Sequence, residues 1–208
     1  MARTPLTFRR LSGLDRSGPP PPETVEGAPL RPWTIPNAIG YVRLALIPVY
    51  LVLAFSSGDG RDTTAAIIYA AIAGGDYLDG IAARVTGQYS RLGALLDPLV
   101  DRMLVVSGVV VCWHFELLPR LPLGILAARE LVMLVLSQIG LRKGIDLKIN
   151  YIGRWAVWPT MFALFLAMLS TTWIAEASLW LGLGMTLIAT GFYFREGYEK
   201  LRPPSSGA

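Results

Sequence analysis

Six long apolar stretches, separated by short polar or basic connections, dominate the pattern of hydrophobic and polar positions along the chain. Each stretch is long enough for an α-helix to cross a hydrocarbon layer roughly 30 Å thick. Tryptophan and tyrosine residues gather near the ends of these stretches, as they do at the two interfaces of a membrane. The pattern therefore predicts six transmembrane helices, at about residues 37–55, 63–83, 93–113, 123–139, 155–171 and 177–194.

The composition agrees with an all-α integral membrane protein. At 208 residues the chain has the length of one domain, and 53% of its residues are hydrophobic. Its mean hydropathy of +0.47 is too high for an ordinary soluble protein of this size. The single cysteine, Cys112, excludes a disulfide within the chain and a cysteine-rich metal site.

The first 32 residues differ in composition from the rest of the chain. They are rich in arginine and proline and have too few apolar residues to bury a core, so we expect residues 1–32 to form a disordered basic tail. No apolar segment lies near Met1, which predicts that there is no cleavable secretory signal. Residues 33–198 form the predicted six-helix transmembrane domain, and residues 199–208 a short C-terminal tail.

Lysine and arginine lie mainly on one side of the predicted membrane. With six spans both termini share that side, together with the connections at residues 84–92 and 141–154. The opposite side keeps only Arg61 and Arg120. The positive-inside rule therefore predicts a multi-pass protein of the inner (plasma) membrane with both termini in the cytoplasm.

Four aspartates lie inside this apolar pattern, at the cytoplasmic ends of the second and third predicted helices: Asp76, Asp79, Asp97 and Asp101. A carboxylate at membrane depth is costly, which makes these residues candidates for a functional site. Asp76 and Asp79 are spaced i, i+3, and Asp97 and Asp101 are spaced i, i+4, so each pair shares one helix face. A cluster of carboxylates without His or Cys favours a hard divalent ion such as Mg²⁺ or Mn²⁺.

The residues between the aspartates are small or cationic. Arg84 and Arg91 have planar guanidinium groups that suit phosphate oxygens. The backbone is open to close approach by a ligand at several positions with little or no side chain, namely Gly80, Ala82, Ala83 and Gly93. Together with the carboxylates, these residues indicate a site for a metal-bridged phosphate ester.

Written out, the spacing is Asp76-x2-Asp79-Gly80-x2-Ala83-Arg84-x8-Gly93-x3-Asp97-x3-Asp101. This pattern resembles, position for position, the signature of the CDP-alcohol phosphotransferase (phosphatidyltransferase) family of integral membrane phospholipid synthases. The resemblance implies six transmembrane helices around a polar cavity that is open to the cytoplasmic face. It also implies a homodimer that works among membrane lipids and has no nucleic-acid partner.

The resemblance further implies the chemistry of the site. The substrate is a CDP-linked lipid, CDP-diacylglycerol, and an acceptor hydroxyl displaces CMP with the help of Mg²⁺ or Mn²⁺, as two ions. By analogy with the family, Asp76, Asp79 and Asp97 are metal ligands, and Asp101 assists them and is the general base. Gly80, Ala83 and Gly93 leave room for the CDP-lipid, and Arg84 contacts its phosphates.

The acceptor alcohol depends on a separate set of residues. The residues Ile35-Pro36-Asn37, Arg43 and Ile47-Pro48 are similar to the first helix of phosphatidylglycerophosphate synthases and of their actinobacterial-type cardiolipin-forming relatives. Cationic donors for a glycerol phosphate are available at Arg129, Lys148 and Arg154. Where the synthases usually have Gly-Lys-x-Lys-Thr, residues 153–157 read Gly-Arg-Trp-Ala-Val, so the second base and the threonine are absent. Glycerol 3-phosphate and phosphatidylglycerol are thus nearly balanced as acceptors, with a small preference for the first.

Other interpretations remain open from the residues alone. The aspartates fit a divalent-cation transport path or an intramembrane aspartyl protease, and two membrane helices with a polar seam would also carry them. None of these needs small residues and an arginine at fixed spacing. Arg129 and Glu130 also have a structural alternative, because they can pair with each other or with neighbouring helices.

Overall fold

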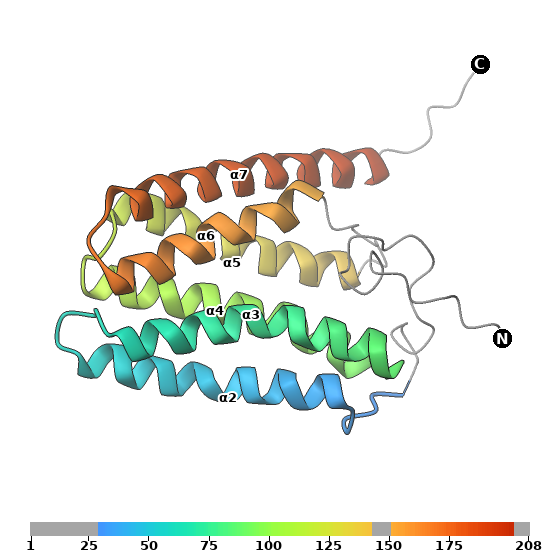
Figure 1. The fold of residues 1–208 in the computed structure, drawn as a ribbon. Coiled ribbons are helices and arrows are strands. Elements are labelled where there is room, and N and C mark those ends of the chain that lie inside the picture. The colour runs from blue at the N-terminus through green and yellow to red at the C-terminus, as the bar shows by residue number, and fades with distance from the viewer. Residues whose placement is uncertain (1–28, 143–150, 202–208) are drawn as a thin grey trace, which may run out of the picture. The chain divides into compact units, whose positions relative to one another are not determined.

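The computed structural model describes residues 29–142 and 151–201, which form α-helices joined by short connections (Figure 1). No strand occurs in these ranges, as the prediction of an all-α protein requires. The helices are α2 (Ile35–Ser56), α3 (Thr63–Thr86), α4 (Arg91–His114), α5 (Arg120–Arg142), α6 (Tyr151–Leu169) and α7 (Trp173–Leu201). Each corresponds to one predicted span. Of the tails predicted at residues 1–32 and 199–208, residues 1–28 and 202–208 lie outside the described residues.

Within the described residues, three helices are long and apolar enough to cross a membrane: α2, α3 and the segment Trp173–Phe192 of α7. Helix α6 has a shorter apolar segment, Trp155–Leu169. Helix α4 contains Asp97, Asp101 and Arg102 within its apolar run and is not among the three. The described part of the protein is therefore helical and contains candidate membrane-spanning segments, and a full set of six spans stays a prediction.

The starts of α2, α3 and α4 are fixed by polar side chains. The residue before each of these helices has a side-chain oxygen that accepts a hydrogen bond from a backbone N–H in the first turn. These pairs are Thr34 with Asn37 (3.3 Å), Asp62 with Ala65 (2.6 Å) and Ser90 with Gly93 (2.9 Å). Local sequence thus determines where three of the helices begin.

Several helices extend further than the apolar stretches that predicted them. Helix α3 continues to Thr86 and α4 begins at Arg91, so the connection predicted at residues 84–92 shortens to residues 87–90. Helix α6 begins at Tyr151 within the predicted basic loop, and α7 continues to Leu201. A helix satisfies its own backbone hydrogen bonds, so it can continue past the apolar stretch that hydropathy detects.

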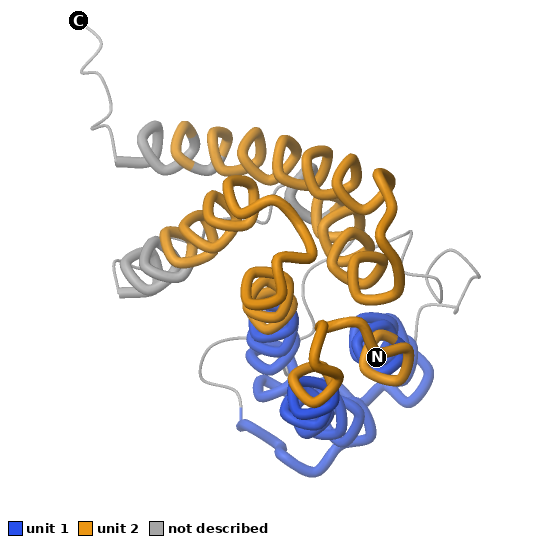
Figure 2. The backbone as a smooth tube through the Cα atoms, turned by 90° about the vertical axis from the view of Figure 1, so that its left-hand side faces the viewer, with its two compact units in different colours: residues 1–53, 67–104 blue, residues 54–66, 105–208 orange. Residues whose placement is uncertain are grey.

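The chain divides into two compact units, coloured separately in Figure 2. Unit 1 consists of residues 1–53 and 67–104, and unit 2 of residues 54–66 and 105–208. In unit 1 the rings of Tyr50 on α2 and Tyr69 on α3 make an edge contact with centroids 5.3 Å apart, and both residues are fully buried. All four aspartates belong to unit 1.

In unit 2, helices α6 and α7 pack closely against each other. A Cβ atom on Gly182 would lie 2.8 Å from the backbone nitrogen of Thr160, so only glycine allows this approach of the two backbones. Leu164 on α6 and Leu179 on α7 are among the fully buried side chains of this unit.

Candidate active site

Hydrogen bonds around Asn37 connect the start of α2 to the start of α4 in unit 1. Asn37 is 1% exposed, and its side-chain nitrogen donates to the carbonyls of Arg31 (3.0 Å) and Pro32 (3.1 Å). The Ser90 hydroxyl donates to Asn37 Oδ1 over 2.9 Å. Because Ser90 also caps α4, one buried amide ties both helix ends together.

Two further hydrogen bonds join the same end of unit 1. The backbone N–H of Ile35 donates to Gln88 Oε1 (2.9 Å), and that of Leu92 donates to the carbonyl of Leu30 (3.3 Å). Residues 30–32, which the sequence prediction included in the tail, therefore take part in the folded unit. These contacts hold the α3–α4 connection beside the start of α2.

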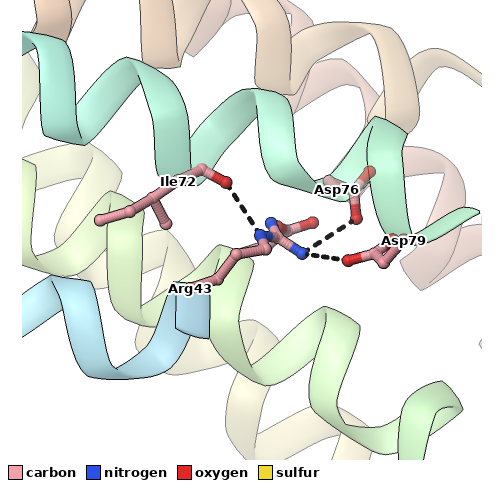
Figure 3. Close-up of polar contacts among 5 residues, drawn as sticks. Arg43, Ile72, Asp76 and Asp79 are labelled. Atoms are coloured by element: carbon pink, nitrogen blue, oxygen red, sulfur yellow. Dashed lines mark hydrogen bonds and ion pairs between the residues drawn. The ribbon is translucent and has the colours of Figure 1, made fainter. Parts of the chain in front are cut away.

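Arg43 extends from α2 towards the aspartates (Figure 3). Its Nε atom donates to the carbonyl of Ile72 over 2.8 Å. Its Nη1 atom lies 2.8 Å from Asp79 Oδ2 and 3.6 Å from Asp76 Oδ1, and its Nη2 atom lies 2.8 Å from Asp101 Oδ1. One guanidinium from α2 thus contacts carboxylates from both α3 and α4.

The four carboxylates differ in their access to solvent. The side chain of Asp79 is only 5% exposed, whereas those of Asp101 and Asp76 are 34% and 49% exposed. Asp97 is partly exposed and interacts electrostatically with Arg43 and with the other three aspartates. Asp76, Asp79 and Asp101 therefore gather around Arg43, as the spacing argument expects, and their cluster has a buried side and an open side.

The approach of Arg43 depends on a glycine that the sequence analysis did not single out. A Cβ atom on Gly75 would lie 2.7 Å from Cδ of Arg43 and 2.9 Å from its Cγ. At the neighbouring Gly74, a Cβ atom would meet nothing within 4 Å. The absence of a side chain at Gly75 therefore leaves the space in which the aliphatic part of Arg43 passes α3.

The residues predicted to receive the CDP-lipid lie beside this cluster. A Cβ atom on Gly80 would lie 3.4 Å from both terminal nitrogens of Arg84, so the Arg84 guanidinium covers the face of Gly80. Ala83 is partly exposed. At Gly93 a Cβ atom would come 2.8 Å from Asn37 Oδ1, which gives this glycine a packing reason in addition to its proposed role in ligand approach.

The predicted acceptor residues lie in other parts of the chain. Arg129, in unit 2, forms an ion pair with Glu130, and its Nε atom donates to Thr190 Oγ1 over 3.1 Å. The alternative that Arg129 and Glu130 pair with each other therefore holds. Lys148 lies outside the described residues. Arg154 lies on α6, and its side chain is also outside them.

The comparisons with known proteins agree with this arrangement of residues. The family model described as CDP-alcohol phosphatidyltransferase matches residues 33–188, which include the whole aspartate cluster and Arg43. The chain belongs to the CDP-alcohol phosphatidyltransferase family. As a member of this family it is a phosphatidyltransferase, and the apolar helices agree with a membrane location.

Two kinds of relative occur among curated members of the CDP-alcohol phosphatidyltransferase family. The chain is 35% identical, over 79% of both chains, to a CMP-forming cardiolipin synthase of Streptomyces coelicolor. It is 24% identical to a CDP-diacylglycerol–glycerol-3-phosphate 3-phosphatidyltransferase of Bacillus subtilis, over 82% of this chain and 98% of the relative. A protein of the same name from Escherichia coli is 30% identical, over 64% of this chain and 75% of the relative. Cation transport and intramembrane proteolysis find no support in these relatives.

Members of the CDP-alcohol phosphatidyltransferase family generally use divalent metal ions. The four carboxylates fit such an ion chemically, because they supply only oxygen ligands, and three of them already contact a cation, the Arg43 guanidinium. Spread around Arg43, they do not form a group of three or more potential ligands close enough to hold an ion, and no such group occurs elsewhere in the described residues.

Sequence reasoning missed the part played by Arg43, Asn37 and Ser90. Arg43 enters the sequence prediction only as part of the first-helix pattern, and its charge is not connected there with the aspartates. The available signal was the combination of one buried cation in the first span with four anions in the next two. Asn37 and Ser90 are hydrogen-bonded although they are 53 positions apart in the sequence, and no local sequence pattern predicts such a contact.

Proposed function

We propose that the chain transfers the phosphatidyl group of CDP-diacylglycerol to phosphatidylglycerol, forming cardiolipin and CMP. Transfer from CDP-diacylglycerol to a glycerol-type acceptor agrees with both kinds of relative. The observation that supports the site most directly is the convergence of aspartates from α3 and α4 around one centre of charge. Carboxylates supply the oxygen ligands that divalent ions beside a diphosphate would need.

The aspartates have distinct proposed roles. Asp76, Asp79 and Asp97 would hold the metal, with Asp101 assisting, and the chemistry that divalent ions would supply there is neutralisation of the diphosphate charge, which makes CMP a better leaving group. Asp101 accepts the proton of the acceptor hydroxyl as the acceptor oxygen bonds to the lipid-side phosphorus and the bond from that phosphorus to the CMP oxygen breaks. Partial exposure of Asp101, at 34%, is compatible with access to an incoming hydroxyl.

The CDP-lipid would lie against the small-residue face between the two pairs of aspartates. Gly80 and Ala83 have little side chain beside the backbone, and the Arg84 guanidinium, which lies over Gly80, is a group that suits phosphate oxygens. Gly93 borders the same end of α4. A CDP-lipid held there has its diphosphate beside the carboxylates.

Two observations favour phosphatidylglycerol over glycerol 3-phosphate. Arg129, one of three predicted donors to a phosphate dianion, is balanced by Glu130, and this leaves the pair with no net charge. Residues 155–157 also lack the second base and the threonine of the glycerol-phosphate pattern. Glycerol 3-phosphate remains the second candidate, supported by the first-helix pattern and by the relatives that use it by name.

An assay of CMP release decides the acceptor. Purified protein with CDP-diacylglycerol and Mg²⁺ or Mn²⁺ is expected to release CMP with phosphatidylglycerol and form cardiolipin, and EDTA is expected to abolish the reaction. Turnover with glycerol 3-phosphate and none with phosphatidylglycerol would show that the product is phosphatidylglycerophosphate and would contradict the proposed acceptor. Full activity in EDTA would contradict the metal site.

A variant of Arg154 sharpens this result. If glycerol 3-phosphate is used, Arg154→Ala should raise its required concentration about 10- to 150-fold, which corresponds to the roughly 1.5–3 kcal/mol of a charge-assisted contact. Phosphatidylglycerol carries one phosphodiester charge and is concentrated in the membrane by its acyl chains. With that acceptor the same variant should change turnover much less.

The proposed setting is the inner membrane, with six spans, both termini in the cytoplasm and the polar cavity open to that side, as a homodimer. The distribution of lysine and arginine supports this orientation. Cys112 is fully buried, so single cysteines introduced at Arg61 and at Gln88 can report the side of each connection. A membrane-impermeant thiol reagent should label only the Arg61 position from outside.

A further inference from the structure

Arg43 is a buried cation with an unusual set of partners. It is 2% exposed, and all of its side-chain nitrogens contact acceptors: the Ile72 carbonyl, Asp79 with Asp76, and Asp101. The geometry is that of a clamp from α2 onto α3 and α4. Neither the matched pattern of aspartates nor the proposed catalytic step assigns this arginine a task.

The clamp uses the oxygens that a metal ion needs. Asp79 Oδ2 and Asp101 Oδ1 each lie 2.8 Å from Arg43, and both carboxylates belong to the proposed ligand set. A guanidinium is permanently charged and cannot withdraw its charge by losing a proton. Its charge therefore always opposes a second cation in the same cluster, at short range and away from bulk water.

We propose that Arg43 is a positioning residue and the resident counter-cation of the aspartate cluster, and that it competes with the divalent ion for Asp79 and Asp101. It holds the three helix segments together before metal binds and keeps metal affinity low. The diphosphate of the CDP-lipid adds the negative charge that Arg43 has neutralised, so metal and substrate favour each other's binding. This inference rests on the proposed metal site.

The test measures metal binding without turnover. Full-length protein in detergent micelles is titrated with Mn²⁺ alone, free Mn²⁺ is followed by electron paramagnetic resonance, and the thermal midpoint is recorded in EDTA. Arg43→Gln, which removes the charge, is expected to bind Mn²⁺ at least about tenfold more tightly than wild type and to have a lower midpoint in EDTA. Arg43→Lys keeps a charge but lacks the fork that spans Asp79 and Asp101, so its Mn²⁺ affinity should fall between the two.

Arg120→Gln is the matched control. Arg120 is exposed, and its pair with Glu116 is a surface i, i+4 contact in unit 2. Its loss should leave both readouts unchanged, because a surface pair of this kind contributes little. A change in Mn²⁺ affinity equal to that of Arg43→Gln would mean that any lost positive charge has this effect, and would overturn the inference.

The remaining outcomes separate the inference from the function on which it rests. If wild type shows no Mn²⁺ binding with or without CDP-diacylglycerol, the metal site itself fails. If wild type binds Mn²⁺ and Arg43→Gln binds it equally or more weakly, Arg43 is only a structural clamp and the inference fails. If Arg43→Gln does not fold, Arg43→Lys is measured instead. Mn²⁺ binding by Arg43→Lys that is equal to or weaker than that of wild type would likewise contradict the inference.

Discussion

Each compact unit contains an arginine that is largely withdrawn from solvent, and the two arginines have different electrostatic surroundings. In unit 2, Arg129 meets one glutamate, Glu130, and one hydroxyl, that of Thr190. In unit 1, Arg43 meets three carboxylates, and a fourth lies within electrostatic range. The first arrangement is balanced in charge, whereas the second has an excess of negative charge with an open side.

The comparison shows why charge balance separates a structural pair from a candidate site. A balanced buried pair gains little by binding anything else, because further charge would be left without a partner. A cluster with excess carboxylates in an apolar surrounding is costly unless cations arrive. The excess in unit 1 is therefore a better indication of function than the presence of buried charge alone.

The largest expected effect concerns the catalytic member of the unbalanced cluster. Asp101→Asn keeps the shape of the side chain but removes the proton acceptor, so the rate of CMP release should fall about 10²- to 10⁴-fold. Binding of CDP-diacylglycerol, measured separately by equilibrium binding, should persist. Glu116→Gln, at an exposed position in unit 2, is the control and should retain its rate. Near-normal turnover of Asp101→Asn would show that the base is another group.

The next effect concerns the balanced pair. Glu130→Gln leaves Arg129 without its counter-ion, and breaking a buried pair in this way costs about 3–5 kcal/mol of stability. The thermal midpoint in detergent should fall accordingly, and Mn²⁺ should not restore it.

A double variant distinguishes a structural pair from a site that needs its charges. Arg129→Met combined with Glu130→Leu removes both charges together and should recover most of the lost stability. The Thr190 hydroxyl keeps a partner in that variant, because it also donates to the carbonyl of Thr186 over 2.8 Å. If the double variant is no more stable than Glu130→Gln, the pair is not the self-contained unit described above.

The smallest expected effect concerns the space at Gly75 that lets Arg43 reach the cluster. Gly75→Ala places a methyl group against the arginine stem and should destabilise unit 1 by about 1–3 kcal/mol. Gly74→Ala meets nothing within 4 Å and should be neutral or stabilising by about 0.5–1 kcal/mol, because glycine is unfavourable inside a helix. Two adjacent substitutions of the same kind thus have opposite expected signs. Equal midpoints would show that Arg43 adapts without cost.

The parts of the fold that follow local rules were predictable from the sequence. Within residues 29–142 and 151–201, apolar length located each helix, and the spacing of the aspartates agrees with the contacts of Asp79 and Asp101 with Arg43. Helix ends were less accurate. Gly153 and Arg154 lie within α6 although their polarity suggested a loop, because hydropathy reports the lipid boundary and not the end of a helix.

The parts that depend on meetings between distant residues were not predictable. The partner of Arg43 on α4 is 58 positions away, and Asn37 and Ser90 are 53 positions apart. A single sequence does not show how two distant helices are aligned along each other, so any of several side chains on a helix face can supply the partner. Gly75 illustrates the limit: its role appears only when the side chain that crosses it is known.

The position of Arg43 on α2, which precedes α3 and α4 in the chain, also affects how the protein is made. The ribosome delivers α2 before α3 and α4, so this arginine reaches the bilayer before its carboxylate partners do. Insertion of an arginine near the centre of a helix costs about 2.5–3.5 kcal/mol on translocon scales. Helix α2 is the most apolar of the three candidate spans, which offsets that cost. When α3 and α4 follow, their aspartates enter a membrane that already contains the Arg43 cation. The order of synthesis from the N- to the C-terminus is therefore also the order in which these charges are neutralised.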